Sequence, residues 1–194
     1  MRDELLLTPR LRGLEEALAK GNRSSESDQV EAAVGILLLD EPSSGLETLL
    51  IQRTERHDDP WSGQIGLPGG RVKNTDPSVR AALEREVLEE VGIRLASYGK
   101  EIGPLSLGHP MRRTQMRVQP WVYGLTKRPP LETGPEVSDA FWVPLSELPS
   151  RKTMSEVTIR REAWKVESFL VRGRVVWGFT YRVLTELLEV PGVL

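Results

Sequence analysis

Three glutamates near the middle of the chain have the type and spacing that metal-assisted chemistry requires: Glu86, Glu89 and Glu90. On a helix, successive residues are about 100° apart, so the three side chains share one face within roughly 100° of arc. Like charges at these spacings repel each other and weaken an isolated helix. A divalent cation bound among them reverses that repulsion, and carboxylate oxygens are ligands that suit Mg²⁺ or Mn²⁺.

The residues around these glutamates favour a metal site. Glu90 falls at the border of an apolar stripe with Leu83 and Val87, where a carboxylate without a partner is costly. Arg85, directly before the first glutamate, can hold a carboxylate in place. The glycine-rich loop ahead of the helix offers a backbone carbonyl as a further oxygen ligand. The alternative interpretation is a solvated acidic face, which is common on surface helices.

A loop and a helix must position this acidic face. The loop is the glycine-rich segment 63–70. Asp76 is expected to cap the N-terminus of the helix, with Pro77 at its first position, and Gly92 supplies the C-terminal stop. Between these ends, apolar residues recur at every fourth position, namely Val79, Leu83, Val87 and Val91.

Strands and two further helices complete the expected fold. The expected strands span residues 32–39, 48–52, 117–125, 140–143 and 174–178, and the first two form a hairpin. The expected helices span residues 5–20 and 179–189, whereas the pattern of 155–171 is ambiguous. Because strands dominate the middle and helices are few, the class is α/β, or more strictly α+β, with a mixed sheet. We expect a helix and linker in residues 1–28 and one domain in residues 29–194.

The composition excludes several classes of protein. The chain has 194 residues, of which 39% are hydrophobic, a formal net charge of −2 and no cysteine. It is long enough to bury a core without disulfides, and the absence of cysteine excludes thiolate zinc sites and a cysteine nucleophile. The near-neutral charge argues against a nucleic-acid partner. No apolar run predicts a membrane span or an export signal, so we expect no membrane partner and a cytoplasmic location.

The stretch 69–93 resembles the Nudix box, G-x5-E-x7-R-E-U-x-E-E-x-G-U, in which U is aliphatic. Eight residues match it in identity: Gly70, Arg85, Glu86, Val87, Glu89, Glu90, Gly92 and Ile93. The stretch departs from the pattern at Asp76, which stands at the first Glu position and is separated from Arg85 by eight residues instead of seven. The resemblance implies a Nudix-type sandwich, in which a mixed sheet lies between helices.

Nudix enzymes hydrolyse a diphosphate that links a nucleoside to another group, and the resemblance implies roles for individual residues. The implied catalytic carboxylates and metal ligands are Glu86, Glu89, Glu90 and, through its carbonyl, Gly70. Arg85 is implied to orient the carboxylates, and the implied cofactor is Mg²⁺, with Mn²⁺ as the alternative. Family members often take a general base from a later loop, for which Glu136 and Glu156 are the candidates here.

Within the family, the chain is most similar to the coenzyme A diphosphatase branch. The elements that carry this similarity are Arg53, Gly63, Gln64 and the segments 67–70, 105–120 and 177–180. Two features depart from the branch, because Trp61 and Ser62 stand where a histidine-containing element is usual and Leu67 replaces an aromatic residue. The implied substrate-binding residues are Arg53, Gln64, Arg112, Arg113 and Trp61.

Three functions stay open at this point. The first is a Mg²⁺-dependent hydrolase that acts on coenzyme A or its derivatives. The second is a related diphosphatase that acts on ADP-ribose, dinucleotides or nucleoside triphosphates, and the third is a Nudix-like module that binds a nucleotide without cleaving it. In each case the expected partner is a small nucleotide-type molecule, and the N-terminal helix is a candidate element for a homodimer.

Overall fold

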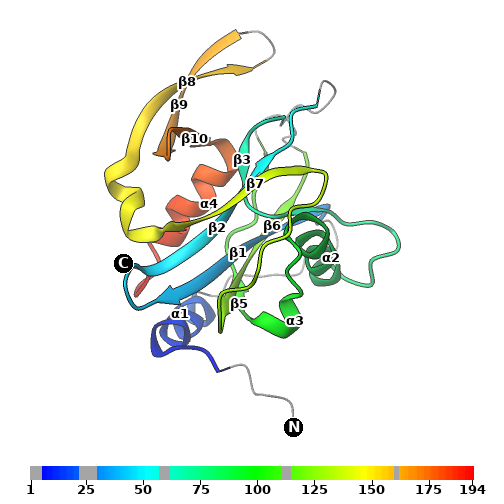
Figure 1. Cartoon of the computed structure of the whole chain (residues 1–194), viewed down its shortest axis with the longest axis vertical. Helices are drawn as coiled ribbons and strands as arrows, with labels where there is room; N and C mark the ends of the chain where they lie inside the picture. Colours follow the sequence, from blue (N-terminus) through cyan, green and yellow to red (C-terminus); the bar gives the residue numbers. More distant parts are fainter. Residues whose placement is uncertain (1–5, 22–29, 57–61, 111–114, 160–161) are drawn as a thin grey trace.

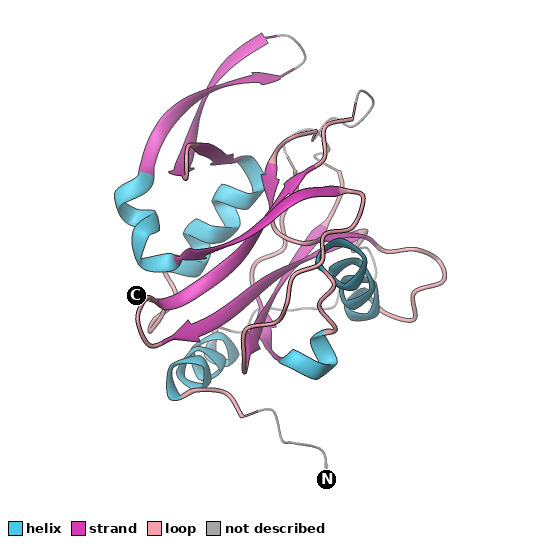
Figure 2. Ribbon diagram, in the orientation of Figure 1, coloured by secondary structure: helices cyan, strands magenta, loops and turns pink. Residues whose placement is uncertain are grey.

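The computed structural model describes residues 6–21, 30–56, 62–110, 115–159 and 162–194. A seven-stranded sheet forms the centre of the molecule (Figures 1 and 2). Its strands are β1 (Ala32–Glu41), β2 (Gly45–Arg53), β3 (Ile65–Gly66), β4 (Gly69–Arg71), β5 (Gly99–Pro104), β6 (Val118–Leu125) and β7 (Val137–Pro144). The pair β1–β6 is parallel and the other pairs are antiparallel, so the expected mixed sheet is confirmed.

The strands β1 and β2 form the predicted hairpin but stay paired only near their turn, from Leu38↔Thr48 to Glu41↔Gly45. Away from the turn, β1 pairs with β4 and β2 pairs with β3. The opposite edges of β1 and β2 are occupied by β6 and β7. The segment 65–71 is therefore wedged between the two separated strand ends, and we call it the glycine wedge.

Helices cover both faces of the sheet. Side chains of α1 (Pro9–Lys20) and α4 (Gly178–Leu188) share one apolar core, and those of α2 (Val79–Val91) and α3 (Leu95–Tyr98) share another. Alternate residues of β1 enter the two cores, with Ile36 on one side and Leu37 on the other, as the pleat of a strand requires. The structure thus has the sandwich arrangement that the family resemblance implies.

The N-terminal helix packs directly on the sheet. Its leucines at helical spacing, Leu11, Leu14 and Leu18, are buried in the same core as α4, as their pattern predicts. Thr8 caps the helix and also donates a hydrogen bond from its hydroxyl to Asp40 at the end of β1 (2.6 Å). No helix among the described residues is long and apolar enough to span a membrane.

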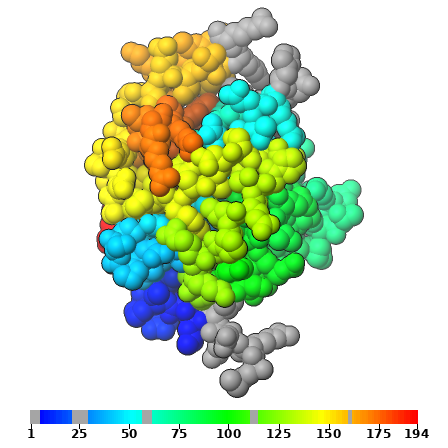
Figure 3. Space-filling model, in the orientation of Figure 1, coloured from blue at the N-terminus to red at the C-terminus, as the bar shows by residue number. Residues whose placement is uncertain are grey.

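The ambiguous segment 155–171 falls within an antiparallel hairpin. Its strands are β8 (Lys152–Ile159) and β9 (Glu162–Val171), which continue into β10 (Arg174–Trp177) and follow the 3₁₀ helix Leu145–Arg151. Figure 3 shows this small sheet, in yellow and orange, at the opposite end of the molecule from the blue α1.

The prediction for the start of α2 was wrong. Ser78 caps the helix, because its hydroxyl accepts a hydrogen bond from the N–H of Ala81 (3.1 Å). The Asp76 carboxylate is turned instead toward Arg85. The predicted stop is confirmed, since Gly92 adopts the left-handed conformation with φ of 74°.

Candidate active site

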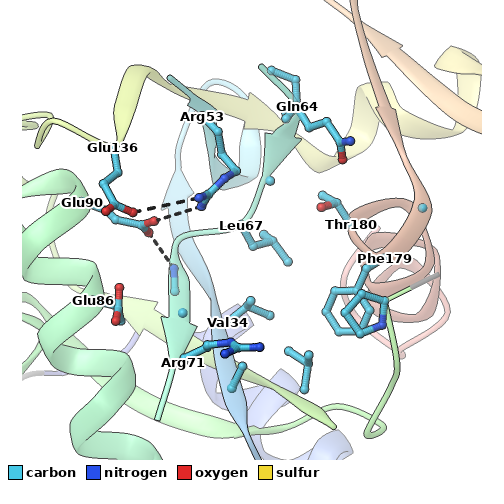
Figure 4. A pocket seen from close by; sticks show the side chains of 18 of the residues that line it. Val34, Arg53, Gln64, Leu67, Arg71, Glu86, Glu90, Glu136, Phe179 and Thr180 are labelled. Carbon is cyan, nitrogen blue, oxygen red and sulfur yellow. Dashed lines mark hydrogen bonds and ion pairs between the residues drawn. The ribbon is translucent and has the colours of Figure 1, made fainter. Parts of the chain in front are cut away.

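A pocket of about 410 Å³ opens between the glycine wedge, α2 and the start of α4 (Figure 4). It brings together six of the residues predicted from the sequence, namely Arg53, Gln64, Gly70, Glu86, Glu90 and the candidate base Glu136. Acidic side chains of α2 form one wall of the pocket. Apolar residues, among them Val34, Leu67, Val118 and Phe179, form much of the rest.

Glu90 is the most buried of the three glutamates, with 3% of its surface exposed. Its Oε2 accepts a hydrogen bond from the backbone N–H of Gly69 (2.8 Å), and its Oε1 lies 3.8 Å from Nη1 of Arg53. Burial raises the pKa of Glu90 to about 8, against the opposing effects of the Gly69 hydrogen bond and the Arg53 charge. The expectation of a carboxylate at the border of the apolar stripe is therefore confirmed.

Glu86 lies directly against the backbone of the glycine wedge. A Cβ atom on Gly70 would stand 2.7 Å from the carboxyl carbon of Glu86, so any larger residue at this position displaces that carboxylate. On its other side, Glu86 accepts a hydrogen bond from Nη1 of Arg85, and Nζ of Lys73 lies 4.0 Å away. The carbonyl-bearing wedge and the Glu86 carboxylate are thus close neighbours, as a shared metal site requires.

Arg85 is fixed by a two-pronged hydrogen bond to Asp76. Its Nε and Nη2 each donate to one carboxylate oxygen of Asp76 at 2.9 Å, and Nη2 also donates to the carbonyl of Arg71 (3.1 Å). The hydrogen bonds from Arg85 and from the backbone of Lys73 lower the pKa of Asp76 to about 2. Asp76, where the chain departs from the Nudix box, therefore holds the arginine that donates to Glu86 and Glu89.

Glu89 stands apart from the other two glutamates. It is exposed and does not line the pocket, although Arg85 Nη1 donates to its Oε2 (3.3 Å). Within the described residues, no group of three or more acidic or histidine side chains is already gathered as a cation would require. Basic side chains neutralise the glutamates instead, with Arg53 at Glu90 and Lys73 and Arg85 at the others. The donor types still suit a hard divalent cation, because the Glu86 and Glu90 carboxylates lie on one wall of the pocket and Glu86 lies against the backbone of Gly70.

Of the two candidate bases, only Glu136 lines the pocket. Its carboxylate oxygens lie 4.0 Å from Nη2 of Arg53 and 3.5 Å from Nη1 of Arg56, and Figure 4 shows it beside Glu90. Glu156 is exposed on β8, away from this pocket.

Arg71 and Phe179 are among the pocket-lining residues that the sequence analysis did not single out. Arg71 immediately follows Gly70, and Phe179 lies inside the segment 177–180 that carries the branch similarity. Their positions next to predicted site residues could have identified them as part of the pocket. Three predicted substrate-binding residues, Trp61, Arg112 and Arg113, lie outside the described residues.

Comparisons with known proteins agree with this architecture. The NUDIX domain family matches residues 30–164. An uncharacterized Nudix hydrolase, NudL, of Escherichia fergusonii is 34% identical over 166 residues, which cover 84% of this chain and 83% of that protein. The uncharacterized protein C14C4.10c of Schizosaccharomyces pombe is 55% identical over 47 residues, which cover 24% of this chain but only 14% of that protein. Among solved structures, the Nudix hydrolase RenU of M. smegmatis shares the fold with a TM-score of 0.51 and 17% identity, covering 63% of this chain and 74% of that one.

Proposed function

The chain is a hydrolase of the NUDIX family, and from that premise we propose that it is a Mg²⁺-dependent diphosphatase whose favoured substrate is coenzyme A or a derivative. One observation carries the proposal. Arg53, Gln64 and Thr180, which belong to the branch-specific elements and are far apart in sequence, line the same pocket as the acidic wall of α2.

The chemistry of a diphosphate explains what this pocket does. The linkage carries dense negative charge, which repels an attacking water molecule. Glu86, Glu89, Glu90 and the carbonyl of Gly70 would hold the cation. When bound, the cation neutralises phosphate charge and lowers the pKa of a bound water. Arg53, between Glu90 and Glu136, positions both carboxylates, and Glu136 is the acidic residue placed to accept the proton.

The proposal is tested by phosphate release with Mg²⁺ or Mn²⁺ from coenzyme A, ADP-ribose, a dinucleotide and nucleoside triphosphates. We expect coenzyme A to have the highest kcat/KM. Glu86→Gln and Glu89→Gln should each lower kcat at least about a hundredfold, because each removes a charged ligand. The matched control is Glu84→Gln, which changes an exposed glutamate of the same helix outside the pocket.

Each contrary outcome points to a different function. If ADP-ribose, a dinucleotide or a nucleoside triphosphate is hydrolysed faster than coenzyme A, that compound replaces coenzyme A as the proposed substrate. If the protein binds these nucleotides but hydrolyses none of them with Mg²⁺ or with Mn²⁺, it is a nucleotide-binding module without catalytic activity. Equal turnover by the wild type and by Glu86→Gln would contradict the metal-ligand assignment.

A further inference from the structure

The strand β8 has an open edge. The strand order of the small sheet is β10–β9–β8, so β8 pairs with β9 on one side and with no other described strand on the other side. Figure 1 shows the β8–β9 hairpin extending away from the central sheet. The edge is regular, because the eight consecutive pairs from Lys152↔Phe169 to Ile159↔Glu162 contain no bulge.

This edge lacks several features that usually prevent an exposed strand from pairing with another chain. Proteins protect such edges with prolines, with bulges or by keeping the strand short, and the eight residues 152–159 contain no proline. The hairpin also carries three of the six large apolar side chains that are exposed among the described residues, namely Met154, Trp164 and Leu170. The surface of the hairpin therefore favours contact with another protein surface.

The geometry of antiparallel strands limits how two copies of β8 can pair. Only every second residue of a strand directs its backbone N–H and C=O toward a given neighbour. Two antiparallel copies of one strand therefore match residues that are an even number of positions apart. The two-fold axis between the copies then passes through a residue, which faces the same residue of the other copy.

An axis through Met154 makes the charged residues of the edge complementary. Lys152 of each copy then lies opposite Glu156 of the other, and Thr153 lies opposite Ser155. Lys152 and Glu156 are exposed, and neither forms a salt bridge within the part of the chain that the structure describes. An axis through Glu156 would instead place two carboxylates opposite each other. Opposite charges directly across a strand pair stabilise it, whereas like charges weaken it.

We propose that two copies of this chain form a dimer by antiparallel pairing of their β8 edges about a two-fold axis at Met154. The three strands of each copy then make one continuous sheet. Met154, which is 59% exposed in the single chain, is covered by its own copy at the axis. The helix α1 is the weaker candidate for a dimer element, because its apolar face is already buried in the core. One strand pair is smaller than a standard interface, so the dimer should dissociate on dilution.

Sedimentation equilibrium of the whole chain over a series of concentrations measures the association. We expect a mass that rises with concentration from 21.8 kDa toward twice that value. Lys152→Glu and Glu156→Lys should each weaken dimerisation at least about tenfold, because each places like charges opposite each other at two symmetric positions. The double variant should restore dimerisation, since it exchanges the two charges. The matched control is Glu16→Lys, the same change at an exposed position of α1, which should dimerise as the wild type does.

An oxidative crosslink tests the position of the axis. Because the chain has no cysteine, Met154→Cys introduces a single thiol, which should form a disulfide-linked dimer with its own copy. The control is Thr158→Cys on the same face of β8, which the proposed axis places about 26 Å from its own copy and which should stay uncrosslinked.

Four results would overturn the proposal. The first is a wild-type mass that stays at that of one chain at every concentration, and the second is weaker association in Glu16→Lys but not in Lys152→Glu. The third is a double variant that associates no better than the single variants. The fourth is equal crosslinking of Met154→Cys and Thr158→Cys.

Discussion

Glu90 on α2 accepts a hydrogen bond from the backbone N–H of Gly69, a residue 21 positions earlier in the chain. The bond joins the acidic wall to the glycine wedge. Gly69 adopts φ of 140°, and a Cβ atom there would stand 2.3 Å from the carbonyl oxygen of Ala33. The placement of the most buried carboxylate therefore depends on a position that only glycine can occupy.

Gly69→Ala should lower the free energy of unfolding by about 2 to 4 kcal/mol, because the new methyl group clashes with β1 and the backbone angle becomes strained. Urea denaturation measures the loss. The control is Gly13→Ala in α1, where a Cβ atom meets nothing within 4 Å and alanine should stabilise the helix by about 0.5 to 1 kcal/mol. Equal stability of Gly69→Ala and the wild type would rule out the close approach to Ala33.

The metal-free protein should become less stable as the pH rises toward 8. The pKa of Glu90 is about 8 in the folded chain and near its ordinary value of 4.5 in the unfolded chain, so between these values the folded state holds the extra proton. Between pH 4.5 and 8, the contribution of Glu90 to the free energy of unfolding falls by at most about 1.4 kcal/mol per pH unit, and it levels off above pH 8.

Urea denaturation in a chelator between pH 5 and 9 measures this slope, which Glu90→Gln should remove. Added Mg²⁺ should oppose the loss at high pH, because a carboxylate ligand must be ionised to bind. The same slope in Glu90→Gln and in the wild type would assign the pH dependence to another group.

Arg85→Lys should lower kcat about tenfold to a hundredfold while the protein stays folded. A lysine cannot reproduce the paired hydrogen bonds from Nε and Nη2 to Asp76, so the contact to Glu86 loses its fixed direction. The control is Arg80→Lys on the same helix, since Arg80 pairs with Glu101 (2.8 Å) and lies over Trp121, outside the pocket. Steady-state kinetics measure kcat, and a melting curve shows that each variant is folded. Equal kcat values for the two variants would contradict the positioning role of Arg85.

Glu136→Gln should lower kcat at least about a hundredfold with little change in KM, because the pocket loses the group that accepts the proton. The competing candidate, Glu156→Gln, should leave kcat within about twofold, since its side chain is exposed on β8. A larger loss of kcat in Glu156→Gln than in Glu136→Gln would instead assign the base to Glu156 on β8.

Local patterns in the sequence predict the helix that carries the glutamates. The four-residue repeat of apolar residues and the glycine at position 92 define α2 to within a few residues, and the spacing of Glu86 and Glu90 places both on the wall of the pocket. The partner of Asp76 was not predictable in this way. An aspartate just before a helix can cap the helix or accept hydrogen bonds from an arginine further along it, and both roles have the same local sequence pattern. Only the conformation of the folded loop determines which of the two Asp76 takes.

Long-range pairing is the part that the sequence does not reveal. The wedge 65–71 is short and rich in glycine, so nothing in its pattern indicates that β4 pairs with β1 rather than forming an ordinary loop. The strand β5 was missed and the β8–β9 hairpin was left ambiguous for a related reason, whereas β10 was predicted. The exposed β8–β9 hairpin has polar and apolar residues mixed on both faces, which gives a weak periodic signal.

The pairing of the wedge with β1 also determines how this enzyme can move. Val72 donates to the carbonyl of Glu31 (2.9 Å) and Gly35 donates to that of Pro68 (2.7 Å), so the ladder continues on both sides of Gly70. Deuterium should therefore replace these two amide hydrogens only when the central strand itself opens, at a rate close to that of the slowest-exchanging core. A loop locked in this way cannot serve as a lid, and adjustment to a bound substrate falls to the segments outside the ladder.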